Sequence, residues 1–99
     1  MATQLDRTKL QSPEFLTILA SNRAKKISLF GSFAQDRASE TSDIDFLVEF
    51  EEAADLLDMV GLKLELEAYF GKKVDVVTVE ALSKYLRSNV LEHSIPLYG

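Results

Sequence analysis

Three aspartates occupy positions where the flanking residues predict β-strands. Asp43 and Asp45 open the segment 43–50, whose centre is rich in β-favouring residues, and Asp75 lies within the apolar segment 73–79. Side chains two residues apart on a strand point to the same face, about 6.6 Å apart along the strand, so Asp43 and Asp45 can converge on one point. Three converging carboxylates repel one another strongly unless a cation joins them.

The donor chemistry narrows the choice of cation. The chain has no cysteine and a single histidine, His93, so the candidate ligands are hard carboxylate oxygens. Such oxygens favour Mg²⁺, or Mn²⁺, over zinc. The three aspartates therefore predict a site for one or two Mg²⁺ ions. The alternative is a solvated strand start that carries Asp43 and Asp45, with Asp75 as an isolated surface acid, and spacing alone leaves both interpretations open.

Gly31 and Ser32 directly follow an apolar segment, 26–30, that is typical of a strand. We expect one or two helical turns over 32–37. A glycine followed by a helical turn presents free backbone N–H groups to a phosphate, and the Ser32 hydroxyl adds a donor. The alternative is an ordinary strand-ending turn.

Helices alternate with short apolar strands along the chain, which predicts the α/β (α+β) class, with one mixed sheet flanked by helices. We expect a helix that begins at Ser12-Pro13-Glu14, strands over 26–30, 43–50 and 73–79, helices over 55–70 and 80–92, and an apolar tail over 95–98. To bring the candidate groups together, the first strand must run antiparallel to the second, and the third must run parallel to the second.

The long helix over 55–70 carries a wide apolar stripe that we expect to be well buried. It begins at Asp55, a residue that caps helices well, and ends at Gly71. The apolar positions of this stripe are Leu56, Leu57, Val60, Leu64 and Ala68, with Met59, Leu62, Leu66 and Tyr69 alongside.

Composition limits the class of protein. Ninety-nine residues suit one domain, predicted over 1–99, and no apolar run approaches the roughly 20 residues of a membrane helix. A net charge of −5 argues against general binding to nucleic-acid backbones and favours cations or a basic partner, for which the acidic run 49–55 is one candidate surface. The lack of cysteine, and an N-terminus without an apolar signal-peptide core, predict a cytoplasmic protein.

The segment 31–45, GSFAQDRASETSDID, resembles the signature of the DNA polymerase β-like nucleotidyltransferases, in which Gly-Ser is followed after a loop by Ser or Thr and Asp-x-Asp. The likeness extends through KKVDVVT to the closing VLEHSIPLYG, and a chain of this length is similar to the minimal nucleotidyltransferases, the MNT half of HEPN–MNT toxin–antitoxin pairs.

This resemblance implies a role for each candidate residue. Gly31 and Ser32 would hold the triphosphate of ATP, Asp43 and Asp45 would ligate two Mg²⁺ ions, and Asp75 would be the third carboxylate, which helps to activate the attacking hydroxyl. Members often carry Arg-Gly after the alanine of GSxA, where this chain has Gln-Asp at 35–36. Arg37, two residues further on, is the expected substitute at the phosphates if the short helix presents it inward.

The implied reaction is transfer of AMP from ATP to a hydroxyl of another macromolecule, and the resemblance suggests a tyrosine of a HEPN toxin. One alternative keeps the fold without turnover, as an antitoxin that neutralises its partner by stoichiometric binding. The presence of all three carboxylates favours the enzyme, because an inert relative has no physical need for them. A second alternative, transfer to a small molecule, would require a further domain or chain to hold the acceptor.

Overall fold

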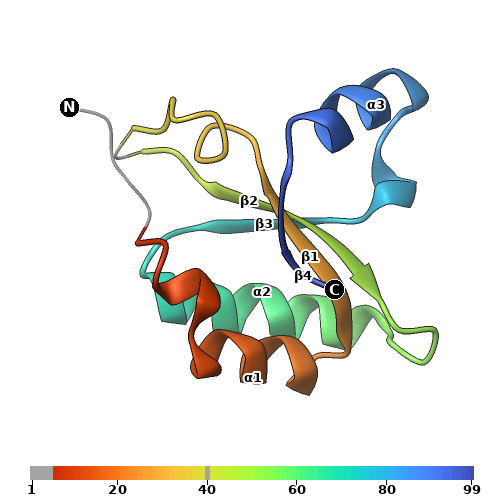
Figure 1. Cartoon of the computed structure of the whole chain (residues 1–99). Coiled ribbons are helices and arrows are strands. Elements are labelled where there is room, and N and C mark those ends of the chain that lie inside the picture. The colour runs from red at the N-terminus through yellow and green to blue at the C-terminus, as the bar shows by residue number, and fades with distance from the viewer. Residues whose placement is uncertain (1–5, 40) are drawn as a thin grey trace.

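The computed structural model describes residues 6–39 and 41–99, and within them it contains one mixed four-stranded sheet (Figure 1). The strands are β1 (Ala24–Phe30), β2 (Ile44–Phe50), β3 (Val74–Val77) and β4 (Ile95–Tyr98), in the order β3-β2-β1-β4. β1 runs antiparallel to β2 and β4, whereas β2 and β3 are parallel. The strand directions predicted for the first three strands are therefore confirmed, as is the α+β class.

The predictions that include residues 1–5 and 40 fall partly outside the described residues. These are the single domain over 1–99 and the N-terminal segment used to predict a cytoplasmic location. No helix of the described chain has the length and apolar character needed to cross a membrane.

Two helices cover one face of the sheet, α1 (Pro13–Ser21) and α2 (Leu56–Phe70) (Figure 1). A short 3₁₀ turn, η1 (Lys9–Gln11), precedes α1. The Ser12 side chain accepts a hydrogen bond from the Phe15 N–H at 3.2 Å, which caps α1 as expected. The core between helices and sheet is fully buried; its largest members are Phe15, Phe46, Leu19, Ile27, Leu29, Ile44, Leu62, Leu66, Val48 and Val74.

Local capping residues fix both ends of α2. Asp55 and Asp58 form a reciprocal capping box at its start, and Gly71 ends it in the left-handed conformation with φ +67°. The expected burial of its apolar stripe is wrong at several positions: Leu56 is 72% exposed, Leu57 79%, Val60 45% and Leu64 57%. Ala68 is exposed as well.

The reason is geometric, because a helix resting on a single sheet buries only one side. In α2 that side carries Leu62 and Leu66. Gly61 sets the approach of α1, since a Cβ at this position would lie 2.6 Å from the Asn22 side-chain oxygen. Apolar residues on the remaining surface of α2 stay exposed.

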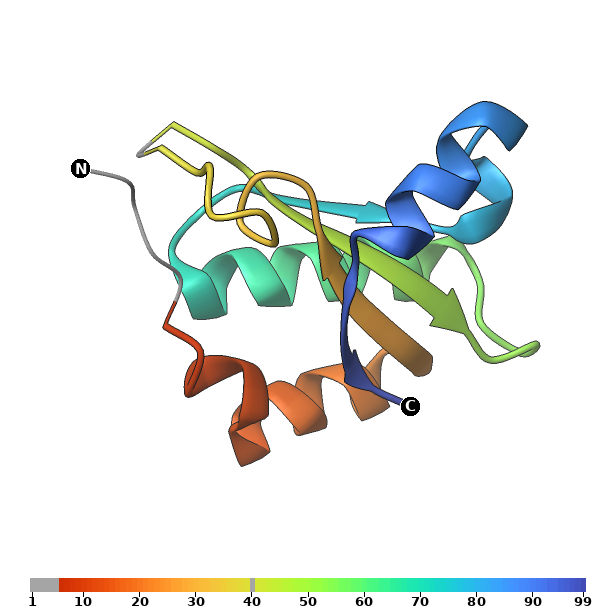
Figure 2. The same ribbon diagram turned by 45° about the horizontal axis from the view of Figure 1, so that its top comes forward.

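On the opposite face of the sheet, the helical elements of the described residues are η2 (Val79–Ala81) and α3 (Lys84–Glu92), which lie at one end (Figures 1 and 2). The helix predicted over 80–92 therefore ends at Glu92 as expected, but its start is wrong, because the α-helix begins at Lys84. Thr78 caps the 3₁₀ turn by accepting a hydrogen bond from the Ala81 N–H. Ser83 caps α3 in the same way, by accepting from the Leu86 N–H. The segment 78–92 therefore contains two separate helix starts instead of one. Leu82 between them is extended.

The expected apolar tail is a strand. β4 adds to the edge of the sheet beside β1, with Ile95 opposite Leu29 and Pro96 opposite Ser28. An edge strand tolerates proline because one side of its backbone has no strand to pair with.

Candidate active site

Asp45 and Asp75 lie next to each other on the face of the sheet that α1 and α2 leave uncovered. They occupy the same level of the parallel pair β2 and β3, and their neighbours Ile44, Phe46 and Val74 point into the core. Because side chains alternate along a strand, both aspartates point away from that core. Burial raises the pKa of the Asp45 carboxyl to about 6, assisted by the charge of Asp75, a hydrogen bond between the two carboxyl groups, and the charge of Asp43.

The charges of Asp43 and Asp75 both act on the Asp45 carboxyl, so all three predicted carboxylates lie close enough to interact electrostatically. Asp43 lies just before β2 and is half-buried, as is Asp45, whereas Asp75 is exposed. Two carboxyl groups in contact cannot both ionise cheaply, so the pair shares a proton below the raised pKa of Asp45. Above that pKa the pair carries an excess of negative charge on the open face.

Gly31 brings the turn after β1 directly onto this pair. Phe30 is opposite Asp45 in the β1–β2 register, and Gly31 follows with φ +75°. A Cβ at Gly31 would collide with the Asp45 carboxylate and would lie 3.1 Å from its Cγ. Two features of this position therefore require glycine: the left-handed backbone conformation and the short distance to the Asp45 carboxylate.

The segment after Gly31 forms one helical turn, which ends at Asp36. The Gln35 N–H donates to the Gly31 carbonyl at 3.2 Å, and the Arg37 N–H donates to the Ser32 carbonyl at 2.8 Å. Asp36 adopts φ +54°, a conformation in which Asp is more common than most side chains. The expected helical turn is therefore short, and it begins at the residues predicted to bind phosphate.

The Arg37 guanidinium is exposed and donates a hydrogen bond to the Gln35 side-chain oxygen. It therefore lies beside residue 35. Its predicted contact with phosphate stays a prediction.

The carboxylates suit a hard divalent cation by donor type but do not form a finished metal centre by themselves. Among residues 6–39 and 41–99, no group of three or more His, Cys, Asp and Glu side chains has the arrangement of a metal site. Asp45 and Asp75 nevertheless share a hydrogen bond between two acids, a contact that loses its proton when a cation binds. The donor set thus fits Mg²⁺ chemically.

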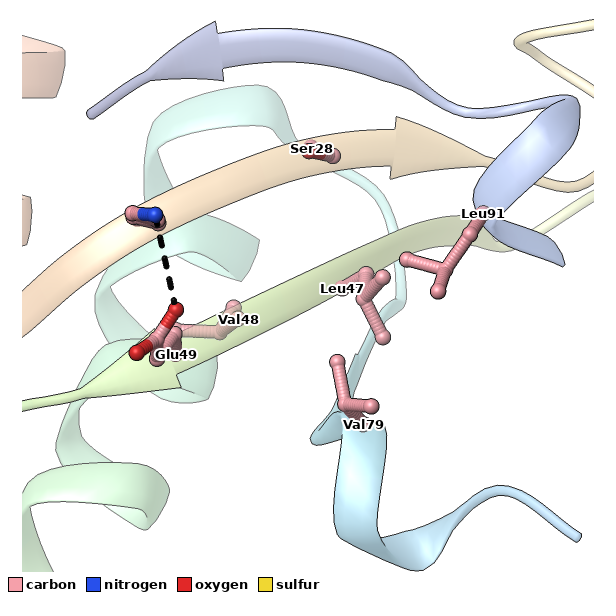
Figure 3. Close-up of a pocket in the computed structure, with 7 residues that line it drawn as sticks. Ser28, Leu47, Val48, Glu49, Val79 and Leu91 are labelled. Carbon is pink, nitrogen blue, oxygen red and sulfur yellow. Dashed lines mark ion pairs between the residues drawn. The ribbon is translucent and has the colours of Figure 1, made fainter. Parts of the chain in front are cut away.

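A pocket on the same face was not predicted from the sequence. It has a volume of about 230 Å³, and its walls come from β1, β2, η2 and α3, including Ser28, Leu47, Val79 and Leu91 (Figure 3). The available signal was Ser28, a polar residue between the buried Ile27 and Leu29. His93 lies outside this pocket, at the end of α3, where its Nδ1 is 2.9 Å from the Asn89 carbonyl oxygen.

Residues 14–99 match the family model described as "Polymerase beta, Nucleotidyltransferase". A "putative protein adenylyltransferase" of Methanocaldococcus jannaschii is 44% identical over 82 residues, which cover 83% of this chain and 88% of that protein. The protein adenylyltransferase MntA of Thermococcus cleftensis is 38% identical over 71 residues, covering 72% of each chain.

Two solved structures are similar over most of the fold. One, described as a "putative minimal nucleotidyltransferase", has a TM-score of 0.79 and 40% identity, and the match covers 97% of this chain and 100% of that one. The other is a toxin–antitoxin structure with AMP-PNP, with a TM-score of 0.72, 27% identity, and coverage of 87% of this chain and 71% of that one.

Proposed function

The chain belongs to the polymerase beta nucleotidyltransferase family, and from that premise we propose that it transfers AMP from ATP to a tyrosine hydroxyl of a HEPN-type toxin. In doing so it would act as the antitoxin of the pair. The observation that carries this proposal is the contact of Gly31 with Asp45 beside Asp75, because it brings the turn that we expect to bind phosphate next to a pair of acids.

Each candidate residue has a role that follows from its position. Asp43, Asp45 and Asp75 would hold Mg²⁺, or Mn²⁺, which when bound stabilises negative charge at the α-phosphate and lowers the pKa of the acceptor hydroxyl. Gly31 lets the phosphates approach the backbone closely, and the Ser32 hydroxyl donates to them. Asp75 is the more exposed member of the acid pair, so it is the one that meets an acceptor from outside.

The nature of the acceptor is supported by two observations. The carboxylates lie on a sheet face that no helix covers at their end within the described residues, so a protein side chain can reach them directly (Figures 1 and 2). Two relatives carry names that state adenylyl transfer to proteins, and one similar structure is a toxin–antitoxin with an ATP analogue. Both favour a protein acceptor over a small molecule.

The test uses the full chain with its partner toxin, Mg²⁺ and ATP labelled at the α-phosphate. We expect label on the toxin. We expect Asp45→Asn or Asp75→Asn to lower the rate of label transfer by about 100-fold or more. Glu14→Gln is the matched control, because it removes one exposed acid on α1, on the opposite side of the sheet from the site. Mutating the acceptor tyrosine to phenylalanine should abolish the label.

The stoichiometric antitoxin makes a different prediction in the same experiment. If the chain binds the toxin tightly and inhibits it without transferring label, at any Mg²⁺ or Mn²⁺ concentration, the proposed transfer is wrong. Toxin inhibition that survives Asp45→Asn unchanged would point the same way.

A further inference from the structure

The pocket and the acid pair occupy consecutive positions on one sheet face. Leu47 follows Asp45 by two residues on β2, so both side chains point to that face about 6.6 Å apart. Ser28 is opposite Leu47 across the β1–β2 pair. Val79 and Leu91 reach over this part of the sheet, and the side chains of Leu47, Val79 and Leu91 converge on one another (Figure 3). The pocket therefore lies next to the acid pair along β2.

The turn at Gly31 and Ser32, to which the proposed function assigns the phosphates, lies on the opposite side of the acids from the pocket. β1 runs antiparallel to β2, so Phe30 and Gly31 lie at the level of Asp45 and beyond, whereas Ser28 lies at the level of Leu47. Figures 1 and 2 show the same separation, with the loop after β1 at one end of the sheet and α3 at the other. Along this face the order is turn, acid pair, pocket.

In-line displacement assigns a direction to this order. The attacking oxygen enters opposite the departing pyrophosphate, and the proposed function places the pyrophosphate on Gly31 and Ser32. With the α-phosphorus at Asp45, the attack then comes from the side of Asp45 that carries the pocket. The 5′ oxygen of the nucleoside is equatorial at the α-phosphorus in such a displacement, so the base leaves sideways from this axis. The pocket thus lies on the acceptor's path.

The lining of the pocket suits an aromatic ring with a polar edge. Leu47, Val79 and Leu91 supply apolar walls, and Ser28 supplies a hydroxyl. At the far end Lys26 and Glu49 form an ion pair at 4.0 Å, which keeps that end polar. A volume of about 230 Å³ admits one ring and its first substituents rather than an extended peptide.

We infer that this pocket binds the aromatic ring of the acceptor tyrosine and points its hydroxyl at the acid pair. The inference rests on the proposed function, since it names the place where the acceptor of that reaction sits. Leu47, Val79 and Leu91 are then residues that position the acceptor. Their contribution falls on acceptor recognition and leaves nucleotide binding to Gly31 and Ser32.

The test fills the pocket without disturbing the core. Leu91 is 48% exposed on α3, so Leu91→Trp can be accommodated by the fold while its larger side chain occupies the pocket. Leu86→Trp is the matched control, because Leu86 is 57% exposed on the same helix and does not line the pocket. The measurements are KM and kcat for the toxin, KM for ATP, the Kd of AMP-PNP by calorimetry, and the thermal midpoint of each variant.

We expect Leu91→Trp to lower kcat/KM for the toxin about tenfold or more, with the Kd of AMP-PNP and the KM for ATP unchanged within twofold. Leu86→Trp should match the wild type in every measurement. A weaker Kd for AMP-PNP in Leu91→Trp would assign the pocket to the adenine ring and overturn the inference. So would a Leu91→Trp variant with normal kinetics toward the toxin.

Failure of the proposed function would look different. In that case the wild-type chain itself would transfer no label to the toxin, and the inferred role of the pocket would fall with it. Normal labelling by the wild type together with normal labelling by Leu91→Trp would overturn the pocket's role alone.

Discussion

The acid pair makes a prediction about stability that needs no partner and no nucleotide. Burial and the neighbouring carboxyls raise the pKa of Asp45 from 3.8 to about 6. The folded chain therefore holds a proton on Asp45 between pH 4 and 6 that the unfolded chain has already lost. Folding stability falls as the pH rises through that interval, and the full penalty applies above pH 6. Replacing Asp45 with asparagine should remove the penalty.

The magnitude follows from the size of the shift. Each pKa unit corresponds to about 1.4 kcal/mol, so the shift sets an upper bound of about 3 kcal/mol. Asp45 is only half-buried, and solvent screening reduces this figure, so we expect about 1–1.5 kcal/mol. Asp45→Asn should therefore be more stable than the wild type by about 1–1.5 kcal/mol at pH 7.5 and equally stable below pH 4.

The assay is urea unfolding of both chains from pH 3.5 to 8, with EDTA present so that no divalent cation binds. Glu52→Gln is the control, an exposed acid remote from the pair, and its stability should follow that of the wild type. A constant difference between Asp45→Asn and the wild type across the whole pH range would refute the electrostatic origin. Destabilisation by Asp45→Asn at pH 7.5 would do the same.

The remaining predictions concern the turn and the long helix. Gly31→Ala and Gly71→Ala both place an alanine at positive φ, which should cost each chain about 1–3 kcal/mol in urea unfolding. Only at Gly31 would the new Cβ strike the Asp45 carboxylate, so that variant alone should lose about 100-fold or more in label transfer; equal losses in both would contradict this account. Leu66→Ala should lower the free energy of unfolding by about 2–5 kcal/mol and Leu57→Ala by less than about 0.5 kcal/mol, since only Leu66 is buried. Similar losses at both positions would mean that the exposed side of the helix is covered in solution.

The features that could be predicted from the sequence are those fixed by local chemistry. Ser12 and Asp55 cap the starts of α1 and α2, and Gly71 ends α2. Each does so through residues within one turn, so these helix ends can be predicted from the local sequence. The strand directions followed from one further condition, that Gly31 and the acids should meet. That condition uses only the order of residues along each strand.

The features that escaped prediction depend on contacts distant in sequence. The burial of α2 is decided by which side meets the sheet, and an apolar pattern wider than one face does not reveal that side. β4 contains a proline, and it is a strand because β1 offers it a free edge. The pocket needs β1, β2, η2 and α3 together, and its one local sign, the polar Ser28 within an apolar strand, does not reveal which other elements close it.

The departure at 35–36 has a physical account in the structure. Family members often carry glycine where this chain has Asp36, and the backbone there has φ +54°, which explains why glycine suits the position and why aspartate is tolerated. They often carry arginine where this chain has Gln35, and here the Arg37 guanidinium hydrogen-bonds the Gln35 side chain. The left-handed residue reverses the chain, so a guanidinium two residues later returns to the vicinity of residue 35. The positive charge of Arg37 therefore lies beside residue 35, and its contact with phosphate stays a prediction.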